Sequence, residues 1–235
     1  MSLHITVIIP AFNTAGFVAQ AIQSVFKQSY TDWDILVVDD GSTDGTWKVV
    51  EPYLPGRRVA LIRFEENRGL PYALHYGITM ATGPILTFLG SDDTLLPNSL
   101  MIGVPPFEQD PKLGYLWTNF KTTKGRVGWS RHLPQGETLW SAIVKRGWWR
   151  ACAQQFFRKD TYMQALYKLN TKYPYAVDYQ LAIIYGETGC NTRHIPVVTY
   201  LYRSPRPGSM STSHRGEQKK CDQEIRKMAL ARAKK

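Results

Sequence analysis

The chain has 235 residues, a mass of 26.8 kDa and a formal net charge of +10 at pH 7. Hydrophobic residues make up 43% and charged residues 20%, which excludes a globally disordered chain and leaves ample length for a buried core. No apolar run reaches the roughly 18 residues that a membrane span needs, and the start of the chain lacks the pattern of a signal peptide. Three widely spaced cysteines fit neither a disulfide framework nor a zinc site, so a reducing cytoplasm is the expected compartment.

The charge is unevenly distributed along the chain. Residues 1–100 carry 6 basic and 10 acidic side chains, residues 101–214 carry 15 and 6, and residues 215–235 carry 8 and 3. An acidic first part suits a divalent cation. A basic second part suits a phosphate-bearing substrate, an anionic membrane surface or nucleic acid.

The first hundred residues alternate between strand and helix patterns. Strands are predicted over 5–9, 34–38, 59–64 and 84–89, and helices over about 16–29, from 46 onward and over 71–81. The continuous apolar runs are typical of strands buried on both faces, and their alternation with helices indicates a mostly parallel sheet. Three of these strands end in loops rich in Asp, Gly or Asn, and ligands of such sheets bind beyond the carboxyl ends of the strands.

The second half has a less regular pattern. Residues 101–140, rich in Pro and Gly, are expected to be irregular, and an aromatic and basic stretch follows at 146–158. The remaining pattern predicts a helix over 177–187, a strand over 197–201, a loop over 203–214 and a basic helix from 217 to the end.

The pair Asp92-Asp93 is the sharpest chemical feature of the sequence, because it directly follows a buried strand. Adjacent carboxylates in that place are unfavourable unless a cation neutralises them. Mg²⁺ takes one or two carboxylates and completes its shell with water and substrate phosphates. The alternative is a solvated turn in which Asp92 caps the helix near Asn98.

A second acidic pair, Asp39-Asp40, follows another buried strand. Asp39 can accept hydrogen bonds from a nucleotide base or ribose, whereas Asp40, Ser42 and Asp44 fit better as loop-forming residues. Arg68, in an Asn-Arg-Gly turn after the third strand, can hold a phosphate, although this signal is weak alone.

Asp178 begins an apolar helix in the basic half, where it is either a cap or, in a cleft with little water, a general base. The segment with Arg203, Arg206 and residues 209–213 is either a solvated loop or one that closes over a phosphate. Neither a P-loop nor the dinucleotide-binding glycine fingerprint occurs in the chain.

Four segments, taken in order, resemble the first half of family 2 glycosyltransferases with the GT-A fold. They are residues 7–13 (VIIPAFN), 37–44 (VVDDGSTD), 66–69 (ENRG) and 91–93 (SDD). Residues 178–181 (DYQL), and Tyr202-Arg203 with residues 209–211, resemble later family segments more loosely. The resemblance covers about residues 3–213. Two positions depart from the family pattern: Gly90 where a third Asp is frequent, and Val177 where Glu is frequent.

The resemblance implies a metal-dependent inverting transfer of a sugar from a nucleotide-diphosphate sugar, by default UDP-linked, to a hydroxyl of a glycan or lipid-linked acceptor in cell-surface polysaccharide synthesis. It implies Mg²⁺ or Mn²⁺ as cofactor. Asp178 is the implied catalytic base, and Asp93 together with Asp92 the implied metal ligands. The nucleotide-binding residues that it implies are Pro10, Ala11, Phe12, Asp39, Arg68, Asp92 and Arg203.

The expected architecture is an α/β GT-A domain over residues 1–214, with a nucleotide-sugar-binding half (1–100) and an acceptor-binding half (101–214). A short basic helix over 215–235 is expected to follow, and it can touch an anionic membrane surface as a peripheral contact at the inner face. Trp148 and Trp149 are candidates for stacking on an acceptor sugar, although at least one of them is expected in the core. The competing hypotheses are a nucleotide-sugar-binding protein without transferase activity and, less favoured, a nucleic-acid-binding module built on the basic half.

Overall fold

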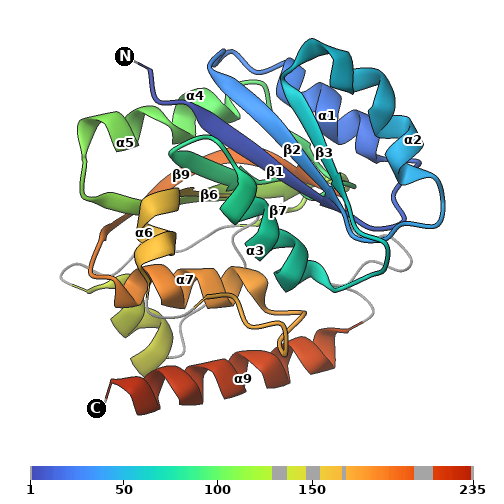
Figure 1. Ribbon diagram of the computed structural model, residues 1–235. Coiled ribbons are helices and arrows are strands. Elements are labelled where there is room, and N and C mark those ends of the chain that lie inside the picture. Colours follow the sequence, from blue (N-terminus) through green and yellow to red (C-terminus); the bar gives the residue numbers. More distant parts are fainter. Residues whose placement is uncertain (1, 129–136, 147–153, 166–167, 204–213, 234–235) are drawn as a thin grey trace.

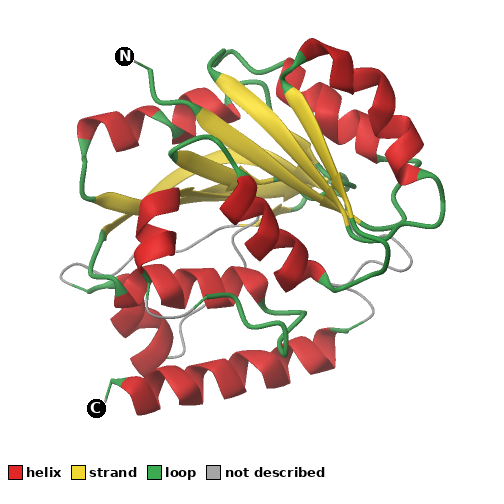
Figure 2. Ribbon diagram, viewed as in Figure 1, coloured by secondary structure: helices red, strands yellow, loops and turns green. Residues whose placement is uncertain are grey.

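The computed structural model describes residues 2–128, 137–146, 154–165, 168–203 and 214–233. A mixed, nine-stranded sheet runs through the molecule in the order β3-β2-β1-β4-β8-β6-β9-β5, with β7 paired beside β6. Helices cover both faces of this sheet (Figure 2).

In the first half, strands and helices alternate as predicted, and the observed ends lie within a few residues of the expected ones. The elements are β1 (Ile5–Ala11), α1 (Val18–Phe26), β2 (Trp33–Asp39), α2 (Thr46–Val50), η1 (Glu51–Gly56), β3 (Val59–Arg63), α3 (Leu70–Met80), β4 (Ile85–Phe88) and β5 (Thr94–Leu95).

The second half is more regular than the sequence predicts. Its elements are α4 (Ser99–Gly103), α5 (Pro105–Gln109), β6 (Leu113–Thr122), β7 (Val127–Gly128), η2 (Ser141–Lys145), β8 (Gln155–Arg158), α6 (Lys159–Gln164), α7 (Val177–Glu187), β9 (Asn191–Tyr202) and α9 (Arg215–Arg232).

Two expectations for this half are wrong. The stretch 101–140 is not irregular throughout, because it contains α5 and the long strand β6. Pro105 occupies the first turn of α5, where its missing N–H is not needed, so the prolines start a helix instead of preventing one. β9 begins six residues earlier than predicted, whereas the basic C-terminal helix is found within its predicted range as α9.

The strands around β1 are parallel, with β1 between β2 and β4 and with β3 beyond β2. β8 interrupts this order, because it pairs antiparallel with both β4 and β6, whereas β6 and β9 are again parallel. As a result, the carboxyl ends of β1, β2 and β4 lie along one edge of the sheet, and the end of β9 approaches β5 near the same edge.

Alternating side chains of the strands enter two separate cores. Val7 and Ile9 of β1 face a cluster that includes α1, α4 and α5, while Ile8 faces a cluster that includes α3, α7 and α9. All three side chains are fully buried, and burial of each one stabilises the fold by about 1.5–3 kcal/mol. The continuous apolar runs of the sequence therefore reflect a sheet covered on both sides.

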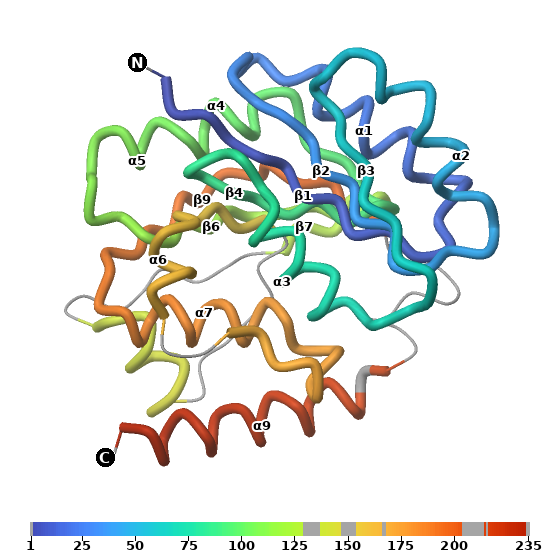
Figure 3. Tube along the Cα trace, in the orientation of Figure 1, coloured from blue at the N-terminus to red at the C-terminus, as the bar shows by residue number. Residues whose placement is uncertain are grey.

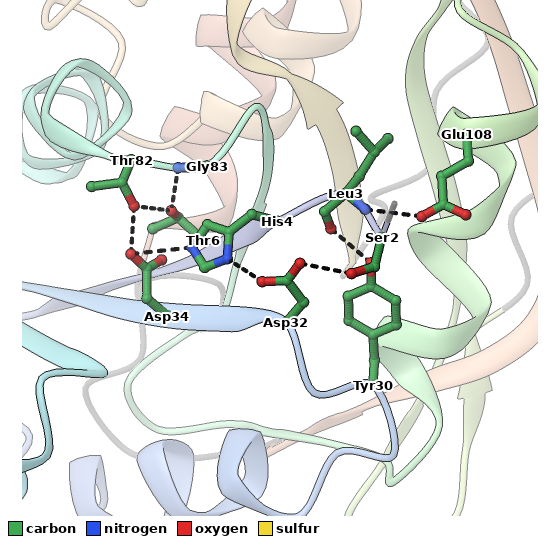
Figure 4. Close-up of polar contacts among 10 residues, drawn as sticks. All are labelled: Ser2, Leu3, His4, Thr6, Tyr30, Asp32, Asp34, Thr82, Gly83 and Glu108. Atoms are coloured by element: carbon green, nitrogen blue, oxygen red, sulfur yellow. Dashed lines mark hydrogen bonds and ion pairs between the residues drawn. The ribbon is translucent and has the colours of Figure 1, made fainter.

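The opposite edge of the sheet is closed by a polar network (Figure 4). His4 Nδ1 lies 2.8 Å from Asp32 Oδ1, and His4 Nε2 lies 3.4 Å from Asp34 Oδ2. Burial alone would lower the pKa of His4, but the hydrogen bond with Asp32 and the charge of Asp34 outweigh it, so the pKa is raised. This network ties the start of β1 to β2 and leaves the carboxyl edge for a ligand.

Helix α9 lies beyond α7, at the bottom of the view in Figure 1. Its residues Ile225 and Ala229 are buried in the same core as α7. The helix is thus part of the folded body. Among the described helices, none is long and apolar enough to cross a lipid bilayer.

Candidate active site

The carboxyl edge of the sheet gathers most of the predicted site residues. Ala11, at the end of β1, is paired with Asp39, at the end of β2, and β4 ends just before Gly90. Phe12 follows β1 and is 46% exposed, which leaves an aromatic face open at this edge. Pro10 and Ala11 end β1 opposite Val38 and Asp39 of β2, and Ala11 O accepts a hydrogen bond from Asp40 N at 2.8 Å.

Asp39 is a fully buried carboxylate with one unused oxygen. Its Oδ1 accepts a hydrogen bond from Ser42 N at 3.0 Å, whereas Oδ2 has no hydrogen-bond partner among the described residues. The nearest cation is Arg63, whose Nε lies 3.9 Å from Oδ2 and whose side chain is half exposed. Because a buried acceptor without a donor is costly, Oδ2 is suited to receive an N–H or O–H group from a ligand.

Asp40 has a structural role that the sequence favoured for it. Its two carboxylate oxygens accept hydrogen bonds from Arg68 N and Gly69 N, both at 2.8 Å. Burial, with a smaller contribution from the charge of Asp39, raises the pKa of Asp40 although these two N–H groups oppose the shift. Gly41 fits beside this connection in a left-handed conformation, with φ of +74°.

Ser42 and Asp44 likewise shape the loop. Ser42 Oγ accepts a hydrogen bond from Asn13 N at 3.0 Å, and Asp44 Oδ2 accepts one from Ala15 N at 2.9 Å. These contacts fasten the loop after β2 to the segment after β1. The loop geometry therefore depends on Asp40, Ser42 and Asp44, while Asp39 is left with capacity for a ligand.

Arg68 reaches the site with its backbone but not, in this structure, with its side chain. The guanidinium donates a hydrogen bond to Tyr72 Oη at 2.7 Å and lies over the rings of Phe64 and Tyr72. The Arg68 side chain is exposed, so its guanidinium can contact a ligand that binds at the carboxyl ends of the strands.

Asp93 is the most constrained carboxylate of the site and is 5% exposed. Tyr200 Oη donates a hydrogen bond to its Oδ2, and Arg203 N donates one to its Oδ1, both at 2.7 Å. Burial and then the charge of Asp92 raise the pKa of Asp93 to about 7, although both hydrogen bonds oppose the shift. Tyr200 was not singled out in the sequence, and no local signal identifies it, because it is 107 residues away from Asp93.

The family departure at Gly90 has a local cause in this chain. A Cβ at this position would lie 2.8 Å from Asp93 Oδ2, 3.2 Å from Tyr200 Oη and 3.3 Å from Asp92 Oδ1. Gly90 N also donates a hydrogen bond to Tyr200 Oη at 3.0 Å. The glycine thus leaves room for the two carboxylates and the tyrosine to meet.

Arg203 joins β9 to the acidic turn and to α1. Its Nε donates to Asp92 O at 2.8 Å, its Nη2 donates to Gln20 Oε1 at 2.7 Å, and the guanidinium lies over the ring of Phe17. This arrangement brings the predicted phosphate ligand next to Asp92 and Asp93. Arg206 and residues 209–213, predicted to form the rest of this loop, lie outside the described residues, as do Trp148 and Trp149.

Asp178 lies in the first turn of α7, and its Oδ1 accepts a hydrogen bond from Tyr179 N at 2.9 Å. Val177, which stands where the family frequently has Glu, is a buried apolar side chain in the core that includes α7. The charge of Asp178 helps to raise the pKa of Asp222 in α9, a carboxyl group that the sequence did not single out. No motif marks Asp222, because it stands in a basic segment that resembles a solvated helix.

The residues of the acidic turn fit a hard divalent cation. Asp92 and Asp93 offer oxygen ligands on adjacent residues, and a bound cation would offset the burial and the charge of Asp92 that raise the pKa of Asp93. Within the described part of the chain, no three His, Cys, Asp or Glu side chains gather as a complete ligand set. A cation here would therefore depend on these two carboxylates together with water and ligand phosphates, as is common for Mg²⁺.

The parallel strands that end in acidic loops, with Asp39 on one and Asp92-Asp93 on another, define a site typical of nucleotide-diphospho-sugar transferases with a GT-A fold. A sequence model described as "Glycosyl transferase family 2" matches residues 6–179 of the chain. The chain belongs to this family, which confirms the resemblance seen in the sequence.

Two curated relatives show how the similarity is distributed. The glycosyltransferase GlyG of Streptococcus pneumoniae is 32% identical over 43% of this chain and 34% of its own length. The chondroitin synthase of Escherichia coli is 25% identical over 83% of this chain and 28% of its own length. The chain therefore spans about a third of the length of these relatives.

Two solved structures support the fold. S. aureus TarS 1-349 in complex with UDP-GlcNAc superposes with a TM-score of 0.72, at 19% identity, over 95% of this chain and 65% of that one. The mannosyltransferase PcManGT of Pyrobaculum calidifontis, in complex with GDP-Man and Mn²⁺, superposes with a TM-score of 0.69, at 20% identity, over 90% and 60%. The predicted α/β GT-A fold is thereby confirmed.

Proposed function

We propose that this chain is a metal-dependent inverting glycosyltransferase that moves a sugar from a UDP-sugar to a hydroxyl of a glycan or lipid-linked acceptor in cell-surface polysaccharide synthesis. The observation that carries the proposal is the carboxyl edge itself, where Asp39 ends β2 with a buried oxygen that has no hydrogen-bond partner among the described residues, and the Asp92-Asp93 turn follows β4 on the other side of β1. The names of the chondroitin synthase relative and of the UDP-GlcNAc complex of TarS support the substrate class.

In this proposal residues 1–100 bind the donor. Pro10, Ala11 and Phe12 line the nucleotide pocket, and the unused Oδ2 of Asp39 accepts the N–H of the base. Arg68 and Arg203 lie at the rim, where their guanidinium groups can pair with diphosphate oxygens.

Asp93 and Asp92 are the proposed ligands of Mg²⁺ or Mn²⁺. The metal, when bound, supplies Lewis-acid neutralisation of the charge that develops on the departing diphosphate. Tyr200 and Arg203 N hold the Asp93 carboxylate in one orientation through two hydrogen bonds. Arg203 thereby couples the metal ligand to the proposed phosphate contact.

Asp178 is the proposed general base. The acceptor oxygen forms a bond to the anomeric carbon on the face opposite the diphosphate, while the bond from that carbon to the diphosphate oxygen breaks. The hydroxyl proton passes to Asp178, and the electron pair of the broken bond remains on the diphosphate. Attack from the opposite face inverts the anomeric configuration.

We also propose that residues 101–214 bind the acceptor and that α9 makes a peripheral contact with an anionic membrane surface. Lys219, Lys220 and Lys227 of α9 are exposed, and basic residues near such a surface each contribute about 1 kcal/mol. Co-sedimentation with vesicles that contain anionic lipid tests this contact, and binding that is insensitive to salt would contradict it.

The proposal is tested by calorimetric titration of UDP, GDP, dTDP and CDP, each with and without Mn²⁺. The expected result is selective binding of UDP that Mn²⁺ strengthens and that Asp93→Ala weakens. Asp160→Ala, which removes an exposed carboxylate of α6, is the matched control and should bind as the wild type does. Well-folded wild type that binds none of these nucleotides would refute the proposal.

A further inference from the structure

The interface between α7 and α9 brings a second carboxyl group to the proposed base. Asp222 stands on the inward side of α9, and the charge of Asp178 in the first turn of α7 acts on it. Figure 1 shows α9 running beneath α7. Two acidic side chains, 44 positions apart in a basic part of the sequence, therefore interact electrostatically where α9 packs against α7.

Helix α9 is held firmly enough to give Asp222 a defined position. Ile225 and Ala229 are buried in the core, and Arg226 donates hydrogen bonds to Val144 O at 2.7 Å and Lys145 O at 2.8 Å. Near the end of the helix, Arg232 pairs with Glu187 of α7 at 3.0 Å. These contacts, along both halves of the helix, show that α9 is packed against the rest of the fold.

The surroundings of Asp222 are unusual for a residue of a basic helix. Its Oδ1 is buried and has no hydrogen-bond partner among the described residues. Burial and then the charge of Asp178 raise the pKa of Asp222 to about 7. Burial, followed by the charge of Asp222, raises the pKa of Tyr179 to about 12, with Arg226 opposing the shift. Among the described residues, the titratable groups that interact with Asp222 include Asp178 and Tyr179 from α7 and Cys221 from its own helix, and Arg226 of that helix acts on Tyr179.

We propose that Asp222 is a positioning residue that acts through Asp178 and sets its strength as a base. This inference rests on the proposed function of Asp178. When Asp222 is ionised, its negative charge favours arrival of the acceptor's proton on Asp178, because protonation relieves the repulsion between the two carboxylates. When Asp222 is protonated, that assistance is lost and Asp178 is a weaker base.

The mechanism makes a distinctive prediction for the pH dependence of transfer. In the wild type, kcat should rise as the pH increases through about 7, as Asp222 loses its proton. Asp222→Asn resembles the protonated group at every pH. It should match the wild type near pH 6, lack the rise, and be about three- to tenfold slower at pH 8.

Two further variants separate this role from a structural one. Asp222→Glu should recover the rise in kcat, because it restores the charge. Glu224→Gln removes a charge from the exposed side of the same helix, where Glu224 faces Lys172 at 3.8 Å, and should follow the wild-type profile. UDP binding should be unchanged in all of these variants, since the interactions of Asp222 are with α7 and its own helix, whereas the proposed nucleotide-binding residues lie at the carboxyl ends of the strands.

A second measurement is independent of activity. NMR titration of protein labelled at the aspartate carboxyl carbons, with Asp222→Asn to assign the resonance, should give a midpoint for Asp222 near pH 7 in the wild type. In Asp178→Asn the midpoint should fall but stay above the ordinary value of about 4, because burial, the larger cause of the raised pKa, remains. The same midpoint in both proteins, or a wild-type kcat profile in Asp222→Asn, would overturn this inference alone. Failure of the wild type to bind any nucleotide would instead refute the proposed function.

Discussion

Substitution of Gly41 by alanine should disrupt the connection between the loops after β2 and β3. Gly41 has φ of +74°, and a Cβ there would lie 2.4 Å from Glu66 C and 2.6 Å from Asn67 N. Both contacts are with backbone, so no side chain can rotate away to relieve them. The segment at 66–67 must move, and with it the N–H groups of Arg68 and Gly69 that bind Asp40.

The magnitude follows from two contributions. A non-glycine residue in the left-handed region costs about 1–2 kcal/mol. Each hydrogen bond to a charged group contributes about 1.5–3 kcal/mol, and the shift weakens two of them. Partial loss of both adds about 2–4 kcal/mol, so Gly41→Ala should lower the free energy of unfolding by about 3–6 kcal/mol.

Gly45 provides the matched control. It also has positive φ, +83°, but a Cβ there would meet only Lys48 Cδ, at 4.0 Å. Gly45→Ala should therefore show the backbone strain without the collision, a loss of about 1–2 kcal/mol. Urea unfolding of the two variants with unchanged m-values measures the difference. Losses that agree within about 0.5 kcal/mol would refute the reasoning that the close approach of Gly41 to residues 66–67 fixes this loop.

Three other predictions concern single side chains. His4→Gln should lower the free energy of unfolding near pH 5.5 by less than about 1 kcal/mol, because the network around His4 is partly exposed. Since the pKa of His4 is raised in the folded protein, this stabilisation is present at low pH and should be lost by pH 8.5. A loss in urea unfolding that does not vary with pH would contradict this. Asp39→Asn should weaken UDP binding at least about tenfold in calorimetry with little change in the free energy of unfolding. Asp40→Asn should instead lower the free energy of unfolding by about 1–3 kcal/mol. The reverse pattern would show that Asp40 binds the ligand and that Asp39 stabilises the loop. Asp178→Asn should abolish transfer but retain UDP binding, and retained transfer would favour another base.

The acidic edge of the sheet could be predicted because its geometry is local to each strand. Asp39 and the Asp92-Asp93 pair each follow a continuous apolar run, and parallel strands place such ends side by side. The same reasoning could not find Tyr200, because its contact with Asp93 depends on the return of β9 beside β5. Pairings between strands distant in the sequence leave no periodic signal at either position.

The second half was harder to predict for a different reason. β6 is buried over its first seven residues and mixes Gly, Thr and Asn with aromatic side chains, so neither alternation nor a uniform apolar run marks it. Among the described apolar residues of α9, only Ile225 and Ala229 are buried. An apolar stripe of two residues is hard to distinguish in the sequence from that of a solvent-exposed helix. Its packing depends on polar anchors such as Arg226, whose hydrogen bonds go to backbone carbonyl groups of η2.

These anchors also change how the positive charge of the second half should be interpreted. The sequence suggested that this charge meets phosphates, a membrane or nucleic acid, but several of the cations bind backbone carbonyl groups within the fold. Arg158 donates to Leu113 O and Phe107 O, Lys159 donates to Thr79 O and Ala81 O, and Lys168 donates to Met163 O and Ala165 O. Because these cations already satisfy carbonyl groups, the net charge overstates the surface available to an anionic partner. Arg203, held against the acidic turn, is the described cation of this half whose position best matches a diphosphate.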